Sequence, residues 1–415
     1  MEDTMTITGQ HRGSLAGLKV VDLSRVLAGP LCTQLLADHG AEVVKVEPPA
    51  GDDTRSWGPP FVTEDMSAYF SALNRNKSNI SLDLRTRAGQ EILTKLLHNA
   101  DVLVENFKPG TLAKWGFTDP HLRNTFPALI HCRVTGFGID GPMGSMPGYD
   151  AVLQAYSGLM SMNGEPDGTP MRIAVPVVDM VTGSYAFSGI LLALHARQRT
   201  GTGQMIDCTL LDTAISLLHP HSASFLTDGE IPRRTGSAHP TIAPYDVFHA
   251  QDGPVFIGVG NDRQFNALLE LLGLRADPRF ATNADRLANL PELRGLLASR
   301  IAEFRRGPLT KELLSHGIPA TSLHNVAEAL NDPQVLHRDM VVELDGYRAT
   351  GIPIKLTETP GSVRTPPRPL GADTSTVLSA VGYSPDDVDA LIESGVAQQH
   401  GIDPVRLADA FQGGA

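Results

Sequence analysis

Short runs of β-branched and other apolar residues alternate with longer amphipathic stretches through the first third of the chain. Apolar residues recur at helical spacing in the stretches 31–40 and 89–100, which predicts amphipathic helices there. The short runs are apolar at nearly every position, which is typical of strands buried on both faces of a parallel sheet. Such strands require right-handed crossover connections, so the pattern predicts an α/β fold with a doubly wound parallel sheet covered by helices. The predicted strands are LKVVDL at 18–23, EVVKVE at 42–47, DVLVEN at 101–106 and LIHCRVTG at 129–136.

A change of composition separates this region from a second lobe. The pattern turns helical from about residue 149, and residues 226–245 are then rich in Pro, Gly and Ser. Such a segment interrupts regular structure and is typical of a crossing between lobes. The run GPVFIGVG at 253–260 predicts that the second lobe opens with a strand and continues with helices.

Net charge and cysteine usage exclude several classes of protein. The 415 residues include 46 acidic and 34 basic side chains, a net charge of −12 that would repel nucleic acids and anionic membranes. The polar N-terminal segment, residues 1–14, has no signal-peptide pattern, and we expect no membrane span. Cys32, Cys132 and Cys208 are widely spaced within apolar segments, which indicates buried free thiols and a cytoplasmic location.

Common cofactor and catalytic motifs are missing. GFGIDG at 136–141 matches GxGxxG, but Pro142 and Pro147 follow where a dinucleotide-binding motif requires a helix. The string is therefore interpreted as a glycine-rich turn. The sequence contains no P-loop, HExxH or GxSxG motif, and its histidines are not spaced as metal ligands, so no metal site is expected.

Asp179 interrupts the apolar run IAVPVVDMV where a long helical pattern begins. One interpretation is a helix N-cap, because Asp accepts hydrogen bonds from free N–H groups there. The other is a carboxylate nucleophile, which the helix dipole would keep ionised. The two interpretations are compatible. Asp150 precedes another predicted helix and is interpreted as a cap.

Basic residues gather near the predicted ends of strands, where open α/β sheets bind ligands. Arg75 and Lys77 lie in NRNKSN, and Lys108 and Lys114 lie in FKPGTLAKWG. A solvated basic surface is the alternative.

Several strings, taken together, resemble the class III CoA-transferase family, which includes formyl-CoA and carnitine CoA-transferases and the related α-methylacyl-CoA racemases. The resemblance covers about residues 15–396, with the motifs in order and at family spacing. The strings are LAGLKVVDLSRVLAGPLCTQLLADHGAEVVKVEPPAGDDTR, YFSALNRNKSNISLDL, DVLVENFKPGTLAKWGF, GYDAVLQAYSGLMSMNGEPDGTP, PVVDMVTGSYA, GNDRQF, NDPQVLHRDM and GIPIKLTETPGSVRTPP.

The resemblance implies a CoA-transferase that moves CoA from an acyl-CoA, such as succinyl-CoA, to a free carboxylic acid. Asp179 matches the family's nucleophile, which forms an anhydride with the acyl group and then a thioester with CoA. The acyl-CoA would be a substrate, and no tightly bound cofactor is expected. Small dicarboxylates are the expected acids, because Arg25 or Arg55 could bind a carboxylate in a bidentate manner.

The resemblance also implies the residues that contact CoA. Pro48 and Pro147 stand where formyl-CoA transferase has Arg and Lys, so the phosphate contacts must differ, through Arg75 or Lys108. Leu27 replaces a glutamine of that enzyme, which argues against formyl and oxalate substrates. The residues expected at the CoA site are Val26, Leu27, Ala28, Arg75, Leu82, Asn106, Phe107 and Lys114, with Gly258 and Gly260 in a loop over it.

Tyr149 bears on the racemase alternative. Racemases of this superfamily have a His at this position, and a tyrosine with a pKa near 10 is a poor general base at neutral pH. The transferase is therefore favoured. A non-catalytic acyl-CoA-binding protein with the same fold is the further alternative.

The fold implied by the resemblance is a Rossmann-like large domain with a smaller α/β domain, in which two chains interlock as a homodimer. The large domain would comprise residues 1–225 and 345–415, and the small domain residues 226–344, which agrees with the change of composition near residue 226.

Overall fold

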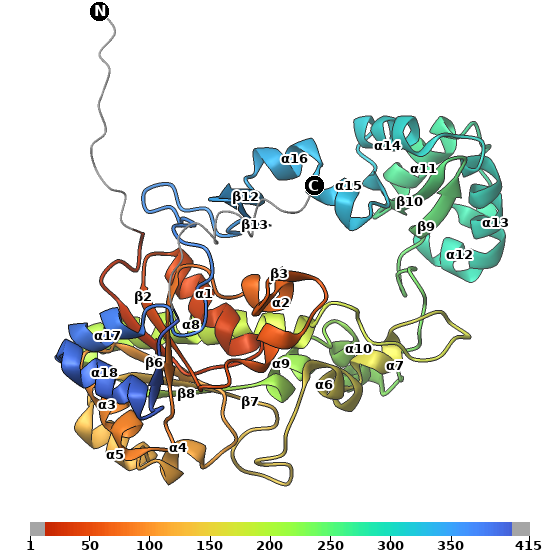
Figure 1. Ribbon diagram of the computed structural model, residues 1–415. Helices are drawn as coiled ribbons and strands as arrows, with labels where there is room; N and C mark the ends of the chain where they lie inside the picture. The colour runs from red at the N-terminus through yellow and green to blue at the C-terminus, as the bar shows by residue number, and fades with distance from the viewer. Residues whose placement is uncertain (1–12, 401–415) are drawn as a thin grey trace, which may run out of the picture. The chain divides into compact units, whose positions relative to one another are not determined.

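The computed structural model describes residues 13–400, and the polar N-terminal residues 1–12 lie outside the described residues. The chain divides into two compact units, each described below by itself (Figure 1). The large unit contains the residues up to 157, residues 174–218 and the residues from 334 onward, and the small unit contains residues 158–173 and 219–333. The boundaries predicted at 225 and 344 thus lie beyond those of the structure, and the short segment 158–173 had no compositional signal that assigns it to the small unit.

A seven-stranded sheet forms the centre of the large unit. Its order is β14-β5-β2-β1-β6-β7-β8, and all neighbouring strands are parallel except β14, which runs antiparallel to β5. The strand order reverses between β1 and β6, which makes this the topological switch point of a Rossmann-like sheet. The predicted α/β class is confirmed. The strands are β1 (Lys19–Asp22), β2 (Glu42–Glu47), β5 (Lys77–Leu82), β6 (Val102–Glu105), β7 (Ile130–Thr135), β8 (Met205–Thr209) and β14 (Ala397–Gln398).

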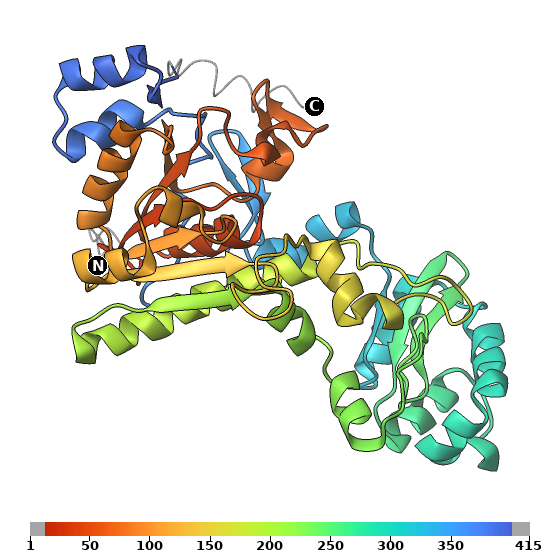
Figure 2. The ribbon, with the colours of Figure 1, turned by 90° about the horizontal axis from the view of Figure 1, so that it is seen from below.

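Helices cover both faces of this sheet. The long helix α8 (Val177–Thr200) and helix α1 (Ala28–Asp38) pack against each other on one face, and α8 also contacts β7 and β8. The opposite face carries a separate apolar core, and Figure 2 shows α17 and α18 on the far side of the strands from α8. The helices on that face are α3 (Arg87–His98), α4 (Thr111–Lys114), α5 (Asp119–Thr125), α17 (Thr374–Ala380) and α18 (Pro385–Glu393).

Helices α1 and α8 approach closely because α8 has a glycine at the crossing. A Cβ atom on Gly183 would lie 2.6 Å from the carbonyl oxygen of Ala28, so any larger residue would force the helices apart. Gly183 therefore sets the distance between Asp179, one turn earlier on α8, and the first turn of α1.

Helix α8 is the one described helix with the length and apolar composition of a membrane span. Its residues Val178, Ala186 and Ile190 are buried in the large unit, against α1 and the sheet. Packing of this kind is also found in the core helix of a globular domain.

The small unit contains a three-stranded antiparallel sheet, β11-β10-β9, with helices packed on it around a separate apolar core. Its elements are α7 (Leu159–Met162), α10 (His221–Asp228), β9 (Tyr245–Ala250), β10 (Gly253–Gly258), α11 (Asp262–Leu271), α12 (Asn283–Ala288), α13 (Leu290–Ile301), α14 (Arg306–Ser315), β11 (Ala320–Ser322) and α15 (Val326–Leu330). The remaining elements, at the unit boundary and in the large unit, are β3 (Phe61–Thr63), β4 (Met66–Ser67), α2 (Ala68–Ser71), α6 (Asp150–Ser157), α9 (Leu210–Ser216), α16 (Pro333–His337), β12 (Val341–Leu344) and β13 (Tyr347–Thr350).

The three cysteines are free, with Cys32 and Cys132 buried and Cys208 half-buried. Cys132 and Cys208 lie on the neighbouring strands β7 and β8, two residues apart in register, and their thiols interact. Their separation in the sequence concealed this proximity.

Candidate active site

A cavity of about 190 Å³ lies at the carboxyl edge of the large sheet, beside the topological switch point. This is where open α/β sheets bind ligands, because the loops after the two diverging strands separate there. The glycine-rich turn predicted at 136–141 is confirmed, and Gly136 and Gly138 lie in the wall. The cavity is lined by Arg25, Val26, Leu27, Ala28, Asp53, Asn106, Phe107, Lys108, Pro109, Val134, Thr135, Gly136, Gly138, Ser145, Met146, Pro147, Gly148, Tyr149, Asp179 and Leu210.

Asp179 reaches this cavity from the first turn of α8, but it is not the cap of that helix. Pro176 occupies the N-cap position and provides no side-chain hydrogen bond. The Oδ2 atom of Asp150 instead accepts hydrogen bonds from the backbone N–H groups of Val178, at 2.8 Å, and Asp179, at 3.2 Å. The N-cap interpretation of Asp179 is therefore wrong, and Asp150 performs that role for α8 from the start of α6.

The environment of Asp179 disfavours its charged form. Burial, and to a smaller extent the nearby carboxylate of Asp150, raise the pKa of Asp179 to about 7. This direction runs against the expectation that the helix N-terminus keeps the group ionised, because burial and the Asp150 carboxylate both disfavour the charged form. A carboxylate that is costly to keep ionised has a raised affinity for a proton, and it is likewise a stronger nucleophile toward an acyl carbon.

Tyr69 is a neighbour of Asp179 that sequence reasoning missed. Burial raises the pKa of this phenol to about 12, and the charges of Asp179 and Asp150 are the next largest causes. Its ring makes an edge contact with Trp57, at 5.3 Å between ring centroids. Tyr69 lies in the string YFSALNRNK, where nothing in the local pattern distinguishes it from a core aromatic residue.

The structure brings together most of the residues expected at the CoA and acyl sites. Seven of them line the cavity with Asp179, namely Arg25, Val26, Leu27, Ala28, Asn106, Phe107 and Tyr149. Asn106 fixes the loop after β1, because its amide donates to the carbonyl oxygen of Arg25 at 2.7 Å and accepts from the Arg25 N–H at 2.8 Å. These two hydrogen bonds join the loop after β1 to the loop after β6 at the switch point.

Four other expected residues lie elsewhere in the large unit. Arg75 is buried and forms an ion pair with Asp38 at 2.7 Å, so its guanidinium is not free for a phosphate. Arg55 is likewise paired with Glu47, at 2.8 Å. Leu82 belongs to the apolar core on the opposite face of the sheet, and Lys114, which ends α4, is not among the lining residues.

Two causes account for these placements. Leu82 ends β5, where side chains alternate between faces and the sequence pattern did not show which face it occupies. Arg55, in a short 3-10 helix, and Arg75, in a turn, are paired with carboxylates of other segments that no local pattern indicates. Lys108 does line the cavity, together with Pro147. Gly258 ends β10 and Gly260 follows it, and both belong to the small unit.

A second cavity, of about 340 Å³, shares Lys108 and Pro109 with the first. Its wall includes Arg133, whose guanidinium is paired with Glu105 and Asp119. Lys108 therefore lies between two hollows at the same sheet edge. Among residues 13–400, no cluster of three or more His, Cys, Asp and Glu side chains could hold a metal ion.

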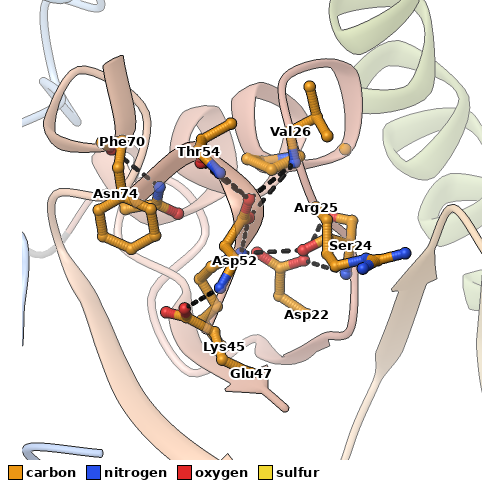
Figure 3. Close-up of polar contacts among 12 residues, drawn as sticks. Asp22, Ser24, Arg25, Val26, Lys45, Glu47, Asp52, Thr54, Phe70 and Asn74 are labelled. Atoms are coloured by element: carbon orange, nitrogen blue, oxygen red, sulfur yellow. Dashed lines mark hydrogen bonds and ion pairs between the residues drawn. The ribbon is translucent and has the colours of Figure 1, made fainter. Parts of the chain in front are cut away.

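The loop after β1 adopts an unusual backbone conformation where it forms the cavity wall. Val26 has a φ of 70°, in the left-handed region that β-branched residues avoid. Figure 3 shows the surrounding network, in which the Asp52 carboxylate lies between the Val26 backbone and Lys45.

Comparisons with known proteins agree with this geometry. The family model for CoA-transferase family III matches residues 15–374. The succinate–glutarate CoA-transferase of Agrobacterium fabrum is 41% identical over 90% of this chain and 97% of its own length. The succinyl-CoA:glutarate CoA-transferase of Mus musculus is 38% identical over 93% of this chain and 91% of its own.

A solved structure has the same fold. The crystal structure of a CAIB/BAIF family protein from Brucella suis superposes with a TM-score of 0.83 and 41% sequence identity. It covers 89% of this chain, and the match spans 100% of that protein. The similarity therefore extends through both units.

Proposed function

The chain belongs to CoA-transferase family III, and we propose that it uses Asp179 to move CoA from an acyl-CoA to a small dicarboxylic acid. CoA thioesters and carboxylic acids are the substrates of such transferases. The observation that carries the proposal is the position of Asp179, a carboxylate with a pKa raised to about 7 in the wall of a cavity at the switch point. Relatives named as CoA-transferases favour this reaction over the racemase and the non-catalytic alternatives.

The chemistry proceeds through covalent intermediates on Asp179. A carboxylate oxygen of Asp179 attacks the thioester carbonyl, the C–S bond breaks, and CoA leaves as a thiolate while an anhydride forms. The thiolate attacks the Asp179 carbonyl carbon, which releases the donor acid and leaves CoA bound to Asp179 as a thioester. The acceptor carboxylate then displaces the thiolate, and the thiolate attacks the new acyl group, which regenerates the Asp179 carboxylate. Water must be excluded, because it would hydrolyse the anhydride.

For CoA itself, we assign the loop after β1 and the loop after β6. Val26, Leu27 and Ala28 would contact the thiol arm, and Asn106 and Phe107 would flank the nucleotide. We assign the phosphates to Lys108 and not to Arg75, because Lys108 lines the cavity whereas Arg75 is paired with Asp38.

For the acid, Arg25 is the better of the two predicted carboxylate partners. Its side chain is 40% exposed and its single ion pair, with Asp53, is long at 3.7 Å. A substrate carboxylate could therefore displace Asp53, whereas Arg55 is held by Glu47 with two hydrogen bonds of 2.8 Å. The names of the two relatives suggest glutarate as acceptor with succinyl-CoA as donor.

We also propose that the enzyme is a homodimer. In the large unit, α8 exposes Tyr185 at 48% and Leu192 at 72%, and α9 exposes Ile215 at 47%. A second copy of the chain would cover such apolar side chains. The cytoplasmic location and the absence of nucleic-acid and membrane partners stay predictions from composition.

The test is CoA exchange between succinyl-CoA and glutarate by the wild type, Asp179→Ala and Asp179→Asn. We expect both variants to lose at least about a thousandfold in kcat/KM, as removal of a covalent nucleophile does. Hydroxylamine added during turnover should convert Asp179 of the wild type to a hydroxamate, located by peptide mass spectrometry. Retained exchange in Asp179→Ala, or a label on another residue, would contradict the proposal.

Solvent exchange distinguishes the racemase. A 2-methylacyl-CoA incubated with the enzyme in deuterated water should gain no deuterium at the α-carbon, whereas a racemase would introduce it.

Size-exclusion chromatography with light scattering tests the dimer, and a monomeric mass at micromolar concentration would contradict it.

A further inference from the structure

The loop of residues 24–26, which we call the β1 loop, is held in place by hydrogen bonds between its backbone and surrounding side chains. The Ser24 N–H donates to Asp22 Oδ1 at 2.9 Å, and the Lys45 ammonium donates to the Ser24 carbonyl oxygen at 2.8 Å. Asn106 satisfies both backbone groups of Arg25. Each residue of the β1 loop is therefore fixed by a polar side chain from a neighbouring segment.

Val26 is the residue of this loop whose conformation needs the most support. At a φ of 70° its branched side chain crowds its own backbone, and such a residue persists only where the surroundings favour that conformation. The residues that follow, Leu27 and Ala28, begin the first turn of α1, and Leu27 provides no side-chain cap. The direction of α1 at the cavity thus depends on the left-handed turn at Val26.

The Asp52 carboxylate supports this turn. Its oxygens lie 3.3 and 3.4 Å from the Val26 nitrogen and accept the N–H. Lys45 donates to the same carboxylate at 3.2 Å, and Thr54 donates through its backbone N–H at 3.1 Å and its hydroxyl at 2.8 Å. Both Asp52 and Lys45 have side chains with 0% exposure. The charged carboxylate is thus held rigidly below the loop, as Figure 3 shows.

The electrostatics agree with a permanent anion at this position. Burial by itself would raise the pKa of Asp52, but Lys45 and the two Thr54 donors lower it below the ordinary value. Lys45 connects the two ends of the β1 loop, because it bonds both the Ser24 carbonyl and the carboxylate that accepts the Val26 N–H.

We propose that Asp52, held by Lys45, is a positioning residue for CoA transfer. It keeps Val26 in the left-handed conformation and thereby places residues 26–28 in the wall of the cavity that Asp179 also lines. Asp52 is not itself among the lining residues of the cavity, so it acts through the backbone of Val26. This inference rests on the proposed function of the cavity as the CoA site.

A double-mutant cycle of Asp52→Asn and Val26→Gly tests the proposal. Glycine adopts a positive φ without steric cost, so the carboxylate is no longer needed to hold the turn once Val26 is replaced. We expect Asp52→Asn to lower kcat/KM for CoA transfer by at least about tenfold in the native background, and by less than about threefold in the V26G background. An equal fold-loss in both backgrounds would overturn the proposal.

A matched control separates positioning from a general loss of folding. Asp38→Asn removes the carboxylate of another buried ion pair, whose partners are Arg75 and Asn76 and which does not contact the β1 loop. We expect this control to lower the unfolding midpoint but to keep kcat/KM within about twofold of the wild type. If Asp38→Asn lost as much kcat/KM as Asp52→Asn, positioning by Asp52 would be contradicted.

Should Asp52→Asn fail to fold, Thr54→Val offers a milder disturbance, because it removes one donor to Asp52. Its loss of kcat/KM should also be smaller in the V26G background, and a loss of equal size would again overturn the proposal. The proposed function fails separately, when Asp179→Ala retains CoA transfer, so the two failures are distinguishable.

Discussion

The two faces of the large sheet are made from alternate residues of the same strands, and they differ sharply. Val21, Val46, Ile80, Leu82 and Leu103 point to the side covered by α3, α17 and α18, where they form a continuous apolar core. On the other face, Asp22, Lys45 and Lys77 are buried beneath α1 and form ion pairs. The face under α1 and α8 also buries apolar side chains of α8, such as Ala186 and Ile190. The difference therefore teaches that the apolar positions of both faces stabilise the unit, while the charged positions beneath α1 position the cavity loops.

Energetics support this division of roles. Burial of apolar side chains contributes directly to stability, whereas a buried ion pair spends most of its attraction on desolvation. Ion pairs with both side chains nearly inaccessible, such as Lys77 with Asp22 and Lys45 with Asp52, are therefore poor explanations of stability. Removal of one partner of such a pair destabilises the protein, because the other charge then stays buried without compensation.

The strongest way to break the charged face is Asp22→Asn. Burial already lowers the pKa of Lys77 to about 8, and Asp22 is the largest opposing cause. Without that carboxylate, Lys77 and Lys45 remain buried with reduced compensation, and we expect the free energy of unfolding to fall by about 4 kcal/mol. Guanidinium denaturation measures the change. The control Glu91→Gln, in an exposed pair with Arg87, should change stability by less than about 0.5 kcal/mol.

The apolar face should respond differently to Ile92→Ala. Ile92 has 0% exposure in the core beneath α3, so the cavity left behind should cost about 3 kcal/mol. Because Ile92 is not among the residues that line the cavity, kcat/KM for CoA transfer should stay within about twofold at a temperature where the variant is folded. A large loss of kcat/KM without unfolding would contradict the division between the faces.

A stability profile against pH would sharpen the comparison at Asp179. Its folded-state pKa of about 7 lies above the ordinary value of 3.8, so the folded protein binds this proton more tightly than the unfolded chain. The associated stability is fully present below about pH 4 and is lost as the pH rises through about 7. Asp179→Asn has no group that titrates at this position. Its free energy of unfolding relative to the wild type should therefore rise with pH, by on the order of 2 kcal/mol at pH 8. Thermal unfolding at pH 4, 6 and 8 measures it, and a constant difference would contradict the raised pKa.

The smallest effect concerns Asp150→Asn. The amide can still accept the N–H groups of Val178 and Asp179 but carries no charge, so the pKa of Asp179 should fall. We expect the acidic limb of the pH profile of kcat/KM to move down by about one unit or less. Asp101→Asn, in an ion pair with Arg197 near the other end of α8, should leave that limb unchanged. An upward shift in Asp150→Asn would be inconsistent with charge repulsion.

Local patterns predicted the strands, the crossover helices and the position of the cavity, because each depends on periodicity and on the edge where parallel strands end. The predicted strands at 42–47 and 101–106 coincide with β2 and β6 to within one or two residues. Asp179 stood out because a lone carboxylate interrupts an apolar run. Each of these signals is contained in a few consecutive residues of the sequence.

Long-range pairing could not be predicted in the same way. Arg75 pairs with Asp38, which lies 37 residues earlier in the sequence, and Asp150 caps α8 from 28 residues before Val178. Tyr69 has no local mark that separates it from a core aromatic. Such partners depend on register and on the packing of helices, which the sequence pattern of one segment does not contain.

The edge strand β14 has a consequence for how the chain is made. It pairs with β5, more than 300 residues earlier, and the nearby Asp373 accepts a hydrogen bond from the Asn79 N–H. On the ribosome, β5 must therefore wait for this neighbour until residues 397–398 have been synthesised, after all six other strands of the sheet. The small unit, complete by residue 333, can fold during that interval.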